Sequence, residues 1–284
     1  MAPIDELEVV SLGAQHLEGA LSLSKVAGWN QTVEDWTMML ETGQGIGVMG
    51  SDNSLVASAL TLPYGSAFGW ISMVLVTRSR RKQGLATKLL NLCIEKLEQG
   101  GRVPVLDATP DGERVYRPLG FHPHFSLTRW QIAEARDIEL TARTQEPVAI
   151  DNSRIEQVIE LDRTHFGGDR SPIIAHLCER CRGFSFMTED RTGFVLGRDG
   201  RLATQIGPLF ASTPEAAIAL FNAALAKISG PVFIDAGDHQ SALISILQQY
   251  NFQKQRPFLR MAKNCKKPFG RMQHLYAMAG PELG

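Results

Sequence analysis

The sequence lacks the features that mark several classes of protein. It has no apolar run near membrane-spanning length, and its acidic start, Met1 to Glu8, lacks the basic and apolar regions of a secretion signal. The 29 Lys and Arg residues nearly balance the 30 Asp and Glu residues, so no excess of positive charge favours nucleic acid or an anionic membrane. We therefore expect a cytoplasmic protein that binds neither.

Cysteine is scarce as well. The 4 cysteines among 284 residues are too few for a disulfide framework. Cys178 and Cys181 form one Cys-x-x-Cys pair, but no second pair follows that could complete a set of four zinc ligands. We interpret both as reduced helix residues and expect no metal site.

The length and composition favour two globular domains. A chain of 284 residues, 44% hydrophobic and 21% charged, suits two domains of about 100 to 150 residues, each with its own core. In the first half, periodicity and turn residues predict helices at 14–27, 32–36, 84–98 and 111–117, and strands at 7–10, 45–50, 55–64, 67–76, 103–108 and 125–132. In the second half they predict helices at 152–166, 171–181 and 214–228, and strands at 184–188, 194–198 and 202–210.

The second half repeats the order of the first. The runs 104–108, 119–121 and 128–130 resemble the runs 233–236, 250–252 and 259–261, at offsets of 128, 131 and 131 residues. Near-constant offsets favour a diverged duplication, although a strand–helix–strand unit is common enough to arise twice by chance. We expect domains at 1–136 and 148–284, with the connection within 137–147.

The most informative stretch follows the apolar strand 70–76. The turn 77–86 contains Gly84 and leads into an amphipathic helix. Such a turn leaves backbone N–H groups pointing outward at the positive end of the helix dipole, where a pyrophosphate can accept them. Gly84 lets the backbone approach closely, and Ala86 keeps the first helical turn narrow. Further phosphate charge can be neutralised by Arg78, Arg80, Arg81 and Lys82.

Other interpretations of this stretch are open. A solvated basic loop before an ordinary helix has the same composition, and a nucleic-acid patch is conceivable. The turn is not a dinucleotide or nucleoside-triphosphate motif, because GxGxxG and GxxxxGK followed by Ser or Thr are both missing. The apolar strand that precedes the turn favours the pyrophosphate site.

Two motifs resemble those of a known superfamily. Arg81-Lys-Gln-Gly84-Leu-Ala86 is similar to the acyl-CoA-binding motif of the GNAT N-acetyltransferases, and Tyr116-Arg-Pro-Leu-Gly120-Phe121 resembles their second signature. The stretch 28–36 resembles their entry helices. The stretches 166–170 and 276–284 resemble bacterial two-domain GNAT proteins with a divergent C-terminal repeat, so the likeness covers nearly the whole chain.

This resemblance implies both the fold and the cofactor. We expect an α/β (α+β) fold of two tandem GNAT-like domains, each a mixed, mostly antiparallel twisted sheet flanked by helices. Acetyl-CoA is expected between two splayed parallel strands that end near Val76 and Ala108. The residues expected to contact it are Met73, Val74, Leu75, Val76, Arg81, Lys82, Gln83, Gly84, Leu85, Ala86 and Thr87.

The second half lacks the corresponding binding features. The strand 202–210 is followed by Ala211-Ser-Thr-Pro-Glu215, without glycine or basic residues. We expect Thr213 to cap the next helix and Pro214 to occupy its first turn. Because a side-chain cap takes up the N–H groups that a pyrophosphate needs, we predict no second cofactor site. The repeat then shapes or covers the substrate pocket, or only stabilises its partner.

Acyl transfer needs a neutral amine, a polarised thioester carbonyl and a proton for the departing thiolate. A backbone N–H of the strand 73–76 could polarise the carbonyl. The resemblance places Tyr116 close to the sulfur, where a phenol with its ordinary pKa of about 10 could donate that proton. Ring packing under the cofactor is the alternative. The sequence identifies no base; the acidic and histidine candidates, which are surface residues as readily, are Glu34, Asp35, His122 and His124.

The acceptor side is the least defined. Trp29 and Glu34 lie on the stretch that resembles the entry helices, which flank the acceptor in the superfamily. The end of the chain, 277–284, is mostly small and apolar, and we hypothesise that it docks in the cleft and brings the carboxylate of Gly284 near the amine. Arg170, just after a predicted helix end, could meet an anionic substrate group or form a helix-terminating ion pair.

We therefore predict an N-acetyltransferase that moves an acetyl group from acetyl-CoA to a primary amine of a small molecule or peptide by direct attack. The alternative is a non-catalytic acyl-CoA-binding sensor or regulatory module. Longer acyl groups are not distinguished from acetyl, and a homodimer is compatible with the sequence.

Overall fold

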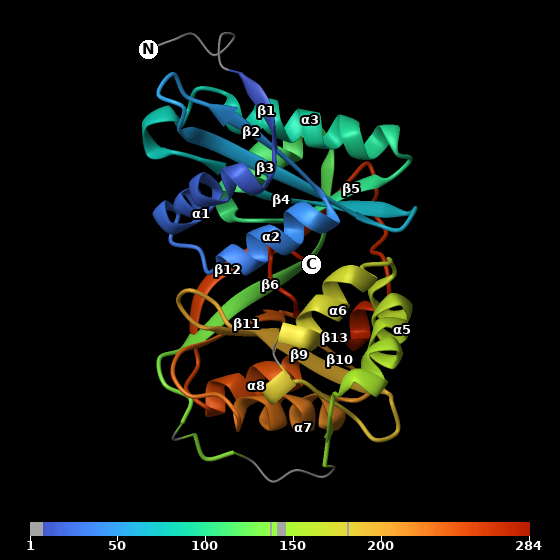
Figure 1. Ribbon diagram of the computed structural model, residues 1–284. Coiled ribbons are helices and arrows are strands. Elements are labelled where there is room, and N and C mark those ends of the chain that lie inside the picture. The colour runs from blue at the N-terminus through green and yellow to red at the C-terminus, as the bar shows by residue number, and fades with distance from the viewer. Residues whose placement is uncertain (1–7, 137, 141–145, 181) are drawn as a thin grey trace. The chain divides into compact units, whose positions relative to one another are not determined.

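A computed structural model describes residues 8–136, 138–140, 146–180 and 182–284 (Figure 1). The chain divides into two compact units, Met1–Leu106 and Asp107–Gly284. Cys181 and residues 141–145 of the predicted connection lie outside the described residues. The domain limits 1–136 and 148–284 stay a prediction.

The first unit is an antiparallel meander extended by one parallel strand. Its strands are β1 (Val9–Leu12), β2 (Gln44–Met49), β3 (Leu55–Tyr64), β4 (Phe68–Val76) and the start of β5 (Val103–Ala108). Its helices are α1 (Leu17–Val26), α2 (Val33–Thr42) and α3 (Leu85–Gln99). Neighbouring strands from β1 to β4 pair antiparallel, whereas β4 and β5 pair in parallel.

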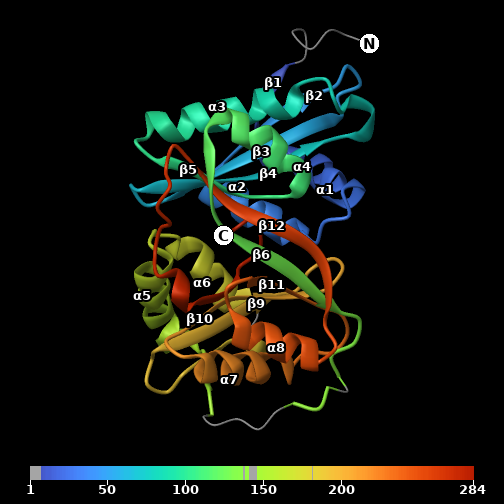
Figure 2. The same cartoon turned by 180° about the vertical axis from the view of Figure 1, so that it is seen from behind.

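The helices of the first unit cover opposite faces of its sheet (Figures 1 and 2). A Cβ added at Gly45 would meet Leu40 of α2, and one added at Gly69 would meet Leu97 of α3. The α2 helix begins with a capping box, in which Thr32 and Asp35 bond each other's backbone N–H groups. It continues to Thr42, beyond the predicted 32–36, because the positions after the cap include buried apolar residues such as Trp36.

The second unit holds a longer mixed sheet. Its strands are β6 (Phe121–Ile132), β7 (Val148–Ala149), β8 (Phe186–Met187), β9 (Gly193–Arg198), β10 (Thr204–Ala211), β11 (Val232–Gly237), β12 (Gln253–Lys263) and β13 (Leu275–Met278). Its helices are α4 (Pro110–Tyr116), α5 (Ile155–Phe166), α6 (Ser171–Arg180), α7 (Pro214–Leu225) and α8 (Ser241–Gln249). The strand order is β12-β6-β11-β13-β10-β9-β8-β7.

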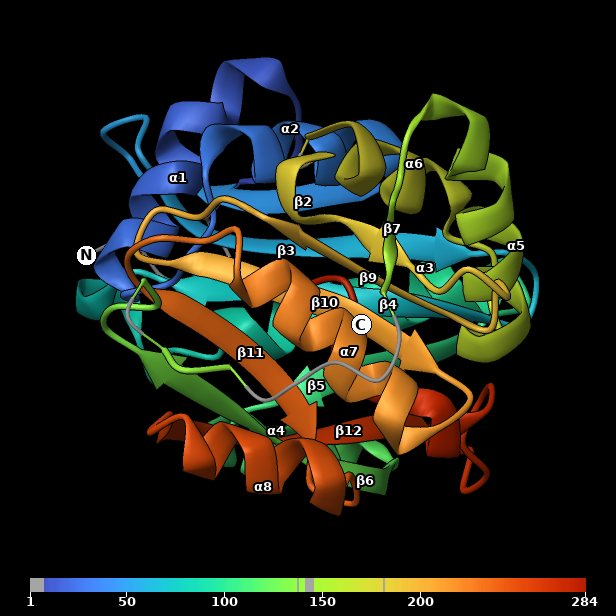
Figure 3. The same cartoon turned by 90° about the horizontal axis from the view of Figure 1, so that it is seen from below.

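The main core of this unit lies between its sheet and α7 and α8. The α7 helix packs against β9 and β10, in front of the sheet in Figure 3. Its alanines let the helix approach closely, and its larger side chains, Leu220 and Phe221, fill the layer with Val195 and Ile234. On the opposite face, α5 packs its His165 ring against Phe210. Among the described residues, no helix has the length and apolar character needed to cross a membrane.

The last strand of the first repeat lies in the sheet of the second unit. β6 pairs antiparallel with β11 on one side and with β12 on the other. This exchange brings corresponding positions of the two repeats together crosswise. Arg129 pairs with Asp235 at 2.8 Å and Arg260 pairs with Asp107 at 2.9 Å, so each buried aspartate meets the arginine of the other repeat.

Some predicted boundaries differ from the structure. β6 begins at Phe121 rather than at 125, because register shifts in its ladder with β12 accommodate Pro123. α8 and β13 were not assigned from the sequence, since short elements of this kind give too few periods to recognise. The strand predicted at 184–188 is reduced to Phe186–Met187 by a turn of 3₁₀ helix at Arg182–Phe184.

Candidate cofactor site

β4 and β5 pair only at their beginnings. Their parallel register joins Phe68 to Val103 and ends at Trp70 and Val105, whereas β4 runs on to Val76. Within the described residues, the edge of β4 beyond Trp70 that faces β5 therefore has no ladder with that strand. Its backbone N–H and C=O groups can pair with an extended ligand that enters between the strands.

A β-bulge interrupts β4 within this open part. Ser72 pairs with Leu60 and Leu75 pairs with Ser58, so Met73 and Val74 together oppose one residue of β3. Met73 has φ of 52°, a left-handed conformation that is uncommon for a side chain of its kind. The buried Ser58 hydroxyl donates to Met73 O at 2.9 Å and helps to hold the bulge. Bulges re-aim backbone groups, and no pattern in the sequence predicted this one.

The turn after β4 is built from its own hydrogen bonds. Arg81 Nε donates to Val76 O at 3.2 Å, which ties the turn to the end of the strand. Gln83 Nε2 donates to Ser79 O at 3.3 Å. Lys82 and Gly84 have φ of 59° and 82°, and this pair of left-handed residues turns the chain into α3. Arg81, Lys82, Gly84 and Thr87 are exposed.

The N-terminus of α3 carries no side-chain cap. Gly84 is its N-cap residue, and a Cβ built there would have no atom within 4 Å. The next residue, Leu85, is 1% exposed and fixes the helix on the sheet. The first N–H groups of this helix therefore face open space beside basic side chains, which is the arrangement that binds a phosphate.

Three other helices of the chain begin with a side-chain cap. In α2, α4 and α7 the N-cap is a threonine whose hydroxyl accepts a hydrogen bond from the first turn. In α7 the bond runs from Ala216 N to Thr213 Oγ1 at 3.2 Å, as the sequence predicted. The helix that corresponds to α3 in the second repeat thus offers its N–H groups to its own side chain.

Tyr116 lies at the end of α4, in the second unit. Its ring packs over Gly112, where an added Cβ would come within 2.8 Å of the ring. The Phe121 ring lies 5.9 Å away. The side chain is half-buried and therefore keeps access to solvent. Its predicted role toward the sulfur stays a prediction.

The residues predicted on the acceptor side are found in both units. Trp29 is half-buried and Glu34 is exposed on α2. Gly284 is buried in the second unit, and its carbonyl oxygen accepts from Ala279 N at 3.1 Å and from the Arg170 guanidinium. The predicted proximity of Gly284 to an amine is not tested by these contacts.

Arg170 forms an ion pair, as one of the two sequence interpretations held. It lies 2.8 Å from Asp162, and both side chains are buried. Its guanidinium also stacks 3.6 Å from the centroid of the Phe166 ring. Because the guanidinium is fully committed to these partners and to the end of the chain, the structure provides no reason to assign it to an anionic substrate.

Two polar residues that the sequence did not single out lie in the first unit. Ser72 and Gln31 are 6% and 3% exposed, and Ser72 Oγ and Gln31 Oε1 have no hydrogen-bond partner among the described residues. Ser72 stands opposite Leu60 in the ladder between β3 and β4, so both side chains lie on the same face of the sheet. A Cβ at Gly45 would meet both Leu60 and α2, so this is the face that α2 covers. No local pattern in the sequence could have found this pair.

Buried thiols supply no nucleophile here. Burial raises the pKa of Cys93 and Cys178 to about 12, which keeps both protonated at neutral pH. Cys93 lies on α3 and Cys178 on α6. For Cys178 this agrees with the prediction of a reduced helix residue; the same prediction for Cys181 falls outside the described residues.

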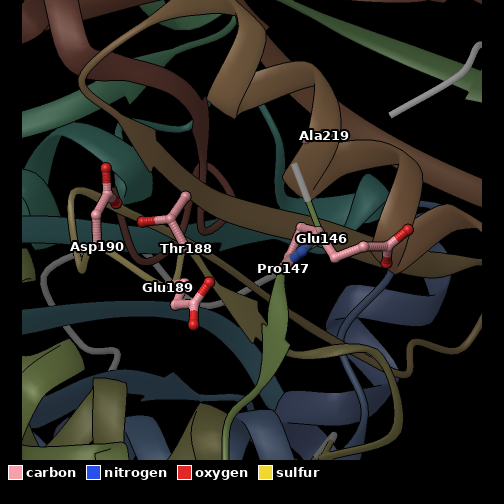
Figure 4. A pocket seen from close by; sticks show the side chains of 6 residues that line it. All are labelled: Glu146, Pro147, Thr188, Glu189, Asp190 and Ala219. Carbon is pink, nitrogen blue, oxygen red and sulfur yellow. The ribbon is translucent and has the colours of Figure 1, made fainter. Parts of the chain in front are cut away.

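A separate hollow of about 410 Å³ lies in the second unit (Figure 4). It is lined by Glu146, Pro147, Thr188, Glu189, Asp190 and Ala219. The polar groups of Thr188 and Asp190 bond the backbone of Thr192, so they shape the turn before β9. None of the residues predicted to bind cofactor or acceptor lines this hollow.

Comparison with protein families finds the same plan in both halves. Residues 19–121 match the acetyltransferase (GNAT) family, and residues 158–277 match a second acetyltransferase (GNAT) domain. These matches include the turn 77–87 in the first half and α7 in the second. The predicted fold of two tandem GNAT-like domains, with mixed and mostly antiparallel sheets, is confirmed.

Relatives match most or all of the chain. An uncharacterized N-acetyltransferase, YitH of Bacillus subtilis, is 24% identical over the whole of both chains. A putative acetyltransferase from Pyrococcus horikoshii has a TM-score of 0.81 at 18% identity, covering 100% of this chain and 98% of that one. A tandem GNAT protein from the clavulanic acid biosynthesis pathway has a TM-score of 0.64 at 14% identity, covering 90% and 98%. At these identities the solved structures establish the fold alone.

Proposed function

The chain belongs to the GNAT acetyltransferase family as a two-domain member, and on this premise we propose that it transfers an acetyl group from acetyl-CoA to a primary amine of a small molecule or peptide. The observation that carries the proposal is the uncapped N-terminus of α3 beside exposed Arg81 and Lys82. This feature suits a pyrophosphate, and the unpaired edge of β4 suits an extended arm of amides. We also propose a cytoplasmic location.

Residues of the first unit would hold the cofactor. The turn 81–87 would bind the pyrophosphate through backbone N–H groups, with Arg81, Lys82 and Gln83 around it. The strand 73–76 would align the extended arm by backbone hydrogen bonds, with the bulge at Met73 and Val74 turning an N–H toward the thioester oxygen. Acetyl-CoA itself supplies an acyl group activated as a thioester.

The acceptor amine attacks in its uncharged form. The proton that it loses passes to solvent, and no side chain is assigned as the base. Tyr116 would donate a proton to the departing thiolate, since a phenol is a weak acid whose ordinary pKa of about 10 suits that donation. Trp29 and Glu34 would bound the acceptor. In this proposal the choice of acetyl-CoA as donor rests on the family, and the acceptor is a primary amine.

Calorimetric titration of acetyl-CoA tests the cofactor site. Wild type should bind one molecule per chain, and Gly84→Glu should weaken binding at least about tenfold, because it puts bulk and negative charge where the pyrophosphate lies. Gly101→Glu is the matched control: Gly101 has φ of 70°, an added Cβ there meets nothing within 4 Å, and it follows the other end of α3. Folded wild type that binds no acetyl-CoA would overturn the proposal.

Tyr116→Phe separates the enzyme from the alternative, a non-catalytic acyl-CoA-binding sensor. As an acid, Tyr116 should contribute about 100-fold to kcat while the Kd for acetyl-CoA changes little. The measurement is release of free thiol with a panel of primary amines. Acetyl-CoA binding with no turnover on any amine favours the sensor, and unchanged kcat in the variant removes the acid role.

A further inference from the structure

The second repeat contains a splayed pair of strands like β4 and β5. β10 and β11 pair in parallel from Thr204 and Val232 only as far as Ile206 and Ile234. As in the first repeat, a strand followed by a helix N-terminus then separates from its parallel neighbour. The opening between β10 and β11 thus corresponds to the opening in which we place the cofactor in the first repeat.

The chain fills this second opening with its own segment. β13 pairs antiparallel with β10 through Leu209 and Phe210, and antiparallel with β11 through Asp235 and Ala236 (Figure 1). Ala277 stands opposite residues of both strands. The edges that remain open in the first repeat are therefore occupied here by peptide groups.

The fit of this segment is close. A Cβ at Gly207 would lie 1.9 Å from Met278 O, so only glycine lets the carbonyl approach the strand at this point. All the residues from Leu275 to Ala279 are at most 3% exposed. Because β13 makes these contacts, the opening between β10 and β11 has no room for another extended molecule.

Two buried arginines hold the segment beyond the strand. Arg198 donates to Ala279 O at 3.3 Å and pairs with Glu282. Arg170 donates to Leu283 O at 2.9 Å and is itself held by Asp162. Each arginine is 1% exposed, so both anchors are shielded from water.

We propose that residues 275–284, the strap, are a built-in occupant of a latent ligand slot in the second repeat, and that the strap excludes the amide-bearing arm of a coenzyme A-type ligand from that slot. The strand edges of the slot suit an extended chain of amides. The capped α7 helix and the absence of basic residues at 211–215 leave no partner for phosphates. The ligand class is therefore pantetheine, the arm without the nucleotide. The comparison with the first slot rests on the proposed function.

The experiment uses the full chain with Ala277→Pro, which removes an N–H from the centre of the strap and clashes with its ladder. Hydrogen exchange first establishes whether amides 275–279 lose their protection, and circular dichroism establishes that the rest stays folded. Arg198→Gln, which releases Ala279 O and Glu282, serves in its place where the proline variant unfolds. Binding of pantetheine and of coenzyme A is then measured by calorimetry.

We expect wild type to bind no pantetheine in the second repeat, and the loosened variant to gain a pantetheine site that coenzyme A occupies with equal affinity. Adding Gly84→Glu to the loosened variant should abolish the tighter binding of coenzyme A than of pantetheine at the first slot. The new site should stay intact. A folded variant with an exchanging strap and no new pantetheine site overturns the proposal. Failure of wild type to bind acetyl-CoA, with the new site present, would count against the proposed function alone.

Discussion

Ser72 is a polar residue in the core of the part of the chain that the structure describes. Its hydroxyl and the Gln31 amide oxygen are buried and unpaired among the described residues. An unpaired buried polar group costs about 1–3 kcal/mol, so a ligand or water that completes it is the expected reason for its presence. Ser72 directly precedes the bulge at Met73, and we infer that its hydroxyl contacts the acyl acceptor.

Ser72→Ala should therefore raise the KM for the acceptor amine about tenfold, the effect of one lost hydrogen bond, with kcat and the Kd for acetyl-CoA nearly unchanged. Steady-state kinetics at saturating acetyl-CoA measure this split. A variant with wild-type KM on every accepted amine, and with raised thermal stability, would show that the hydroxyl is only a structural cost.

His165 makes the stability of the second unit depend on pH. Burial is the main cause that lowers the pKa of His165 from 6.5, and the nearby His274 and Arg271 lower it further. The rings of His165 and His274 lie 5.3 Å apart, and Nδ1 of each has no partner among the described residues. The unfolded chain binds the proton of His165 more readily than the folded chain does. The contribution of neutral His165 to the free energy of unfolding is therefore complete above pH 6.5, and it is lost as pH falls toward the pKa of the folded state.

His165→Phe keeps a ring against Phe210 and removes the titration. We expect its denaturant midpoint to fall less than that of wild type between pH 7 and pH 5. Circular dichroism at a series of pH values measures the two slopes. Equal slopes would mean that the acid sensitivity arises elsewhere, for instance at His124, whose pKa is lowered mainly by burial.

Turn and cap residues are the part of the site that a sequence predicts well. Gly84 and Thr213 act on the backbone next to them, so their identity alone indicated an open helix end in one repeat and a capped one in the other. The bulge at Met73 and the burial of Ser72 were not predictable, because each depends on the register between β3 and β4.

At the scale of elements, the exchange of strands between repeats rests on buried ion pairs. Arg129 is held over the β6–β11 pairing by two hydrogen bonds of 2.8 Å to Asp235. Burial tends to lower the pKa of Arg129, but the neighbouring Asp235 outweighs it and the pKa is raised, so the guanidinium stays charged. Removing one charge would leave the other buried without compensation.

Asp235→Asn should destabilise the chain by about 3–5 kcal/mol for this reason. Glu160→Gln is the control, since the Glu160–Arg163 pair has a similar contact, at 2.7 Å, but lies exposed, and little change is expected. Urea unfolding gives both values. A loss in Asp235→Asn as small as that of the control would mean that β6 is held by its ladders and packing and that the ion pair adds little.

Long amphipathic helices such as α3 were predicted closely, because 15 residues contain several periods of the apolar pattern. β13 contains 4 residues, and the small, apolar composition of residues 277–284 suggested only that the end of the chain docks. Its position between β10 and β11 follows from edges that these strands leave open, which is a property of three segments together. A local pattern cannot carry that information.

At the scale of the whole molecule, the chain carries two GNAT-like repeats with different openings. The sequence offsets identified the repeats, and the crosswise pairs Asp107–Arg260 and Arg129–Asp235 could be foreseen as corresponding positions but not as partners. Which strand of which repeat completes a sheet depends on contacts more than a hundred residues apart, such as Arg260 to Asp107. Local periodicity does not predict such pairings.

The two openings should respond differently to acetyl-CoA. A ligand at 100 times its Kd stabilises the folded state by about 2.7 kcal/mol, which slows exchange of amides that open only when it leaves. We expect slower hydrogen exchange in residues 73–87, where the β4 edge and the α3 N-terminus are free to bind, and no change in residues 207–216, where the strap and Thr213 already occupy the corresponding groups. Exchange measured by mass spectrometry with and without acetyl-CoA distinguishes the two segments. Equal protection of both would mean that the second repeat also binds the cofactor and that its strap yields to it.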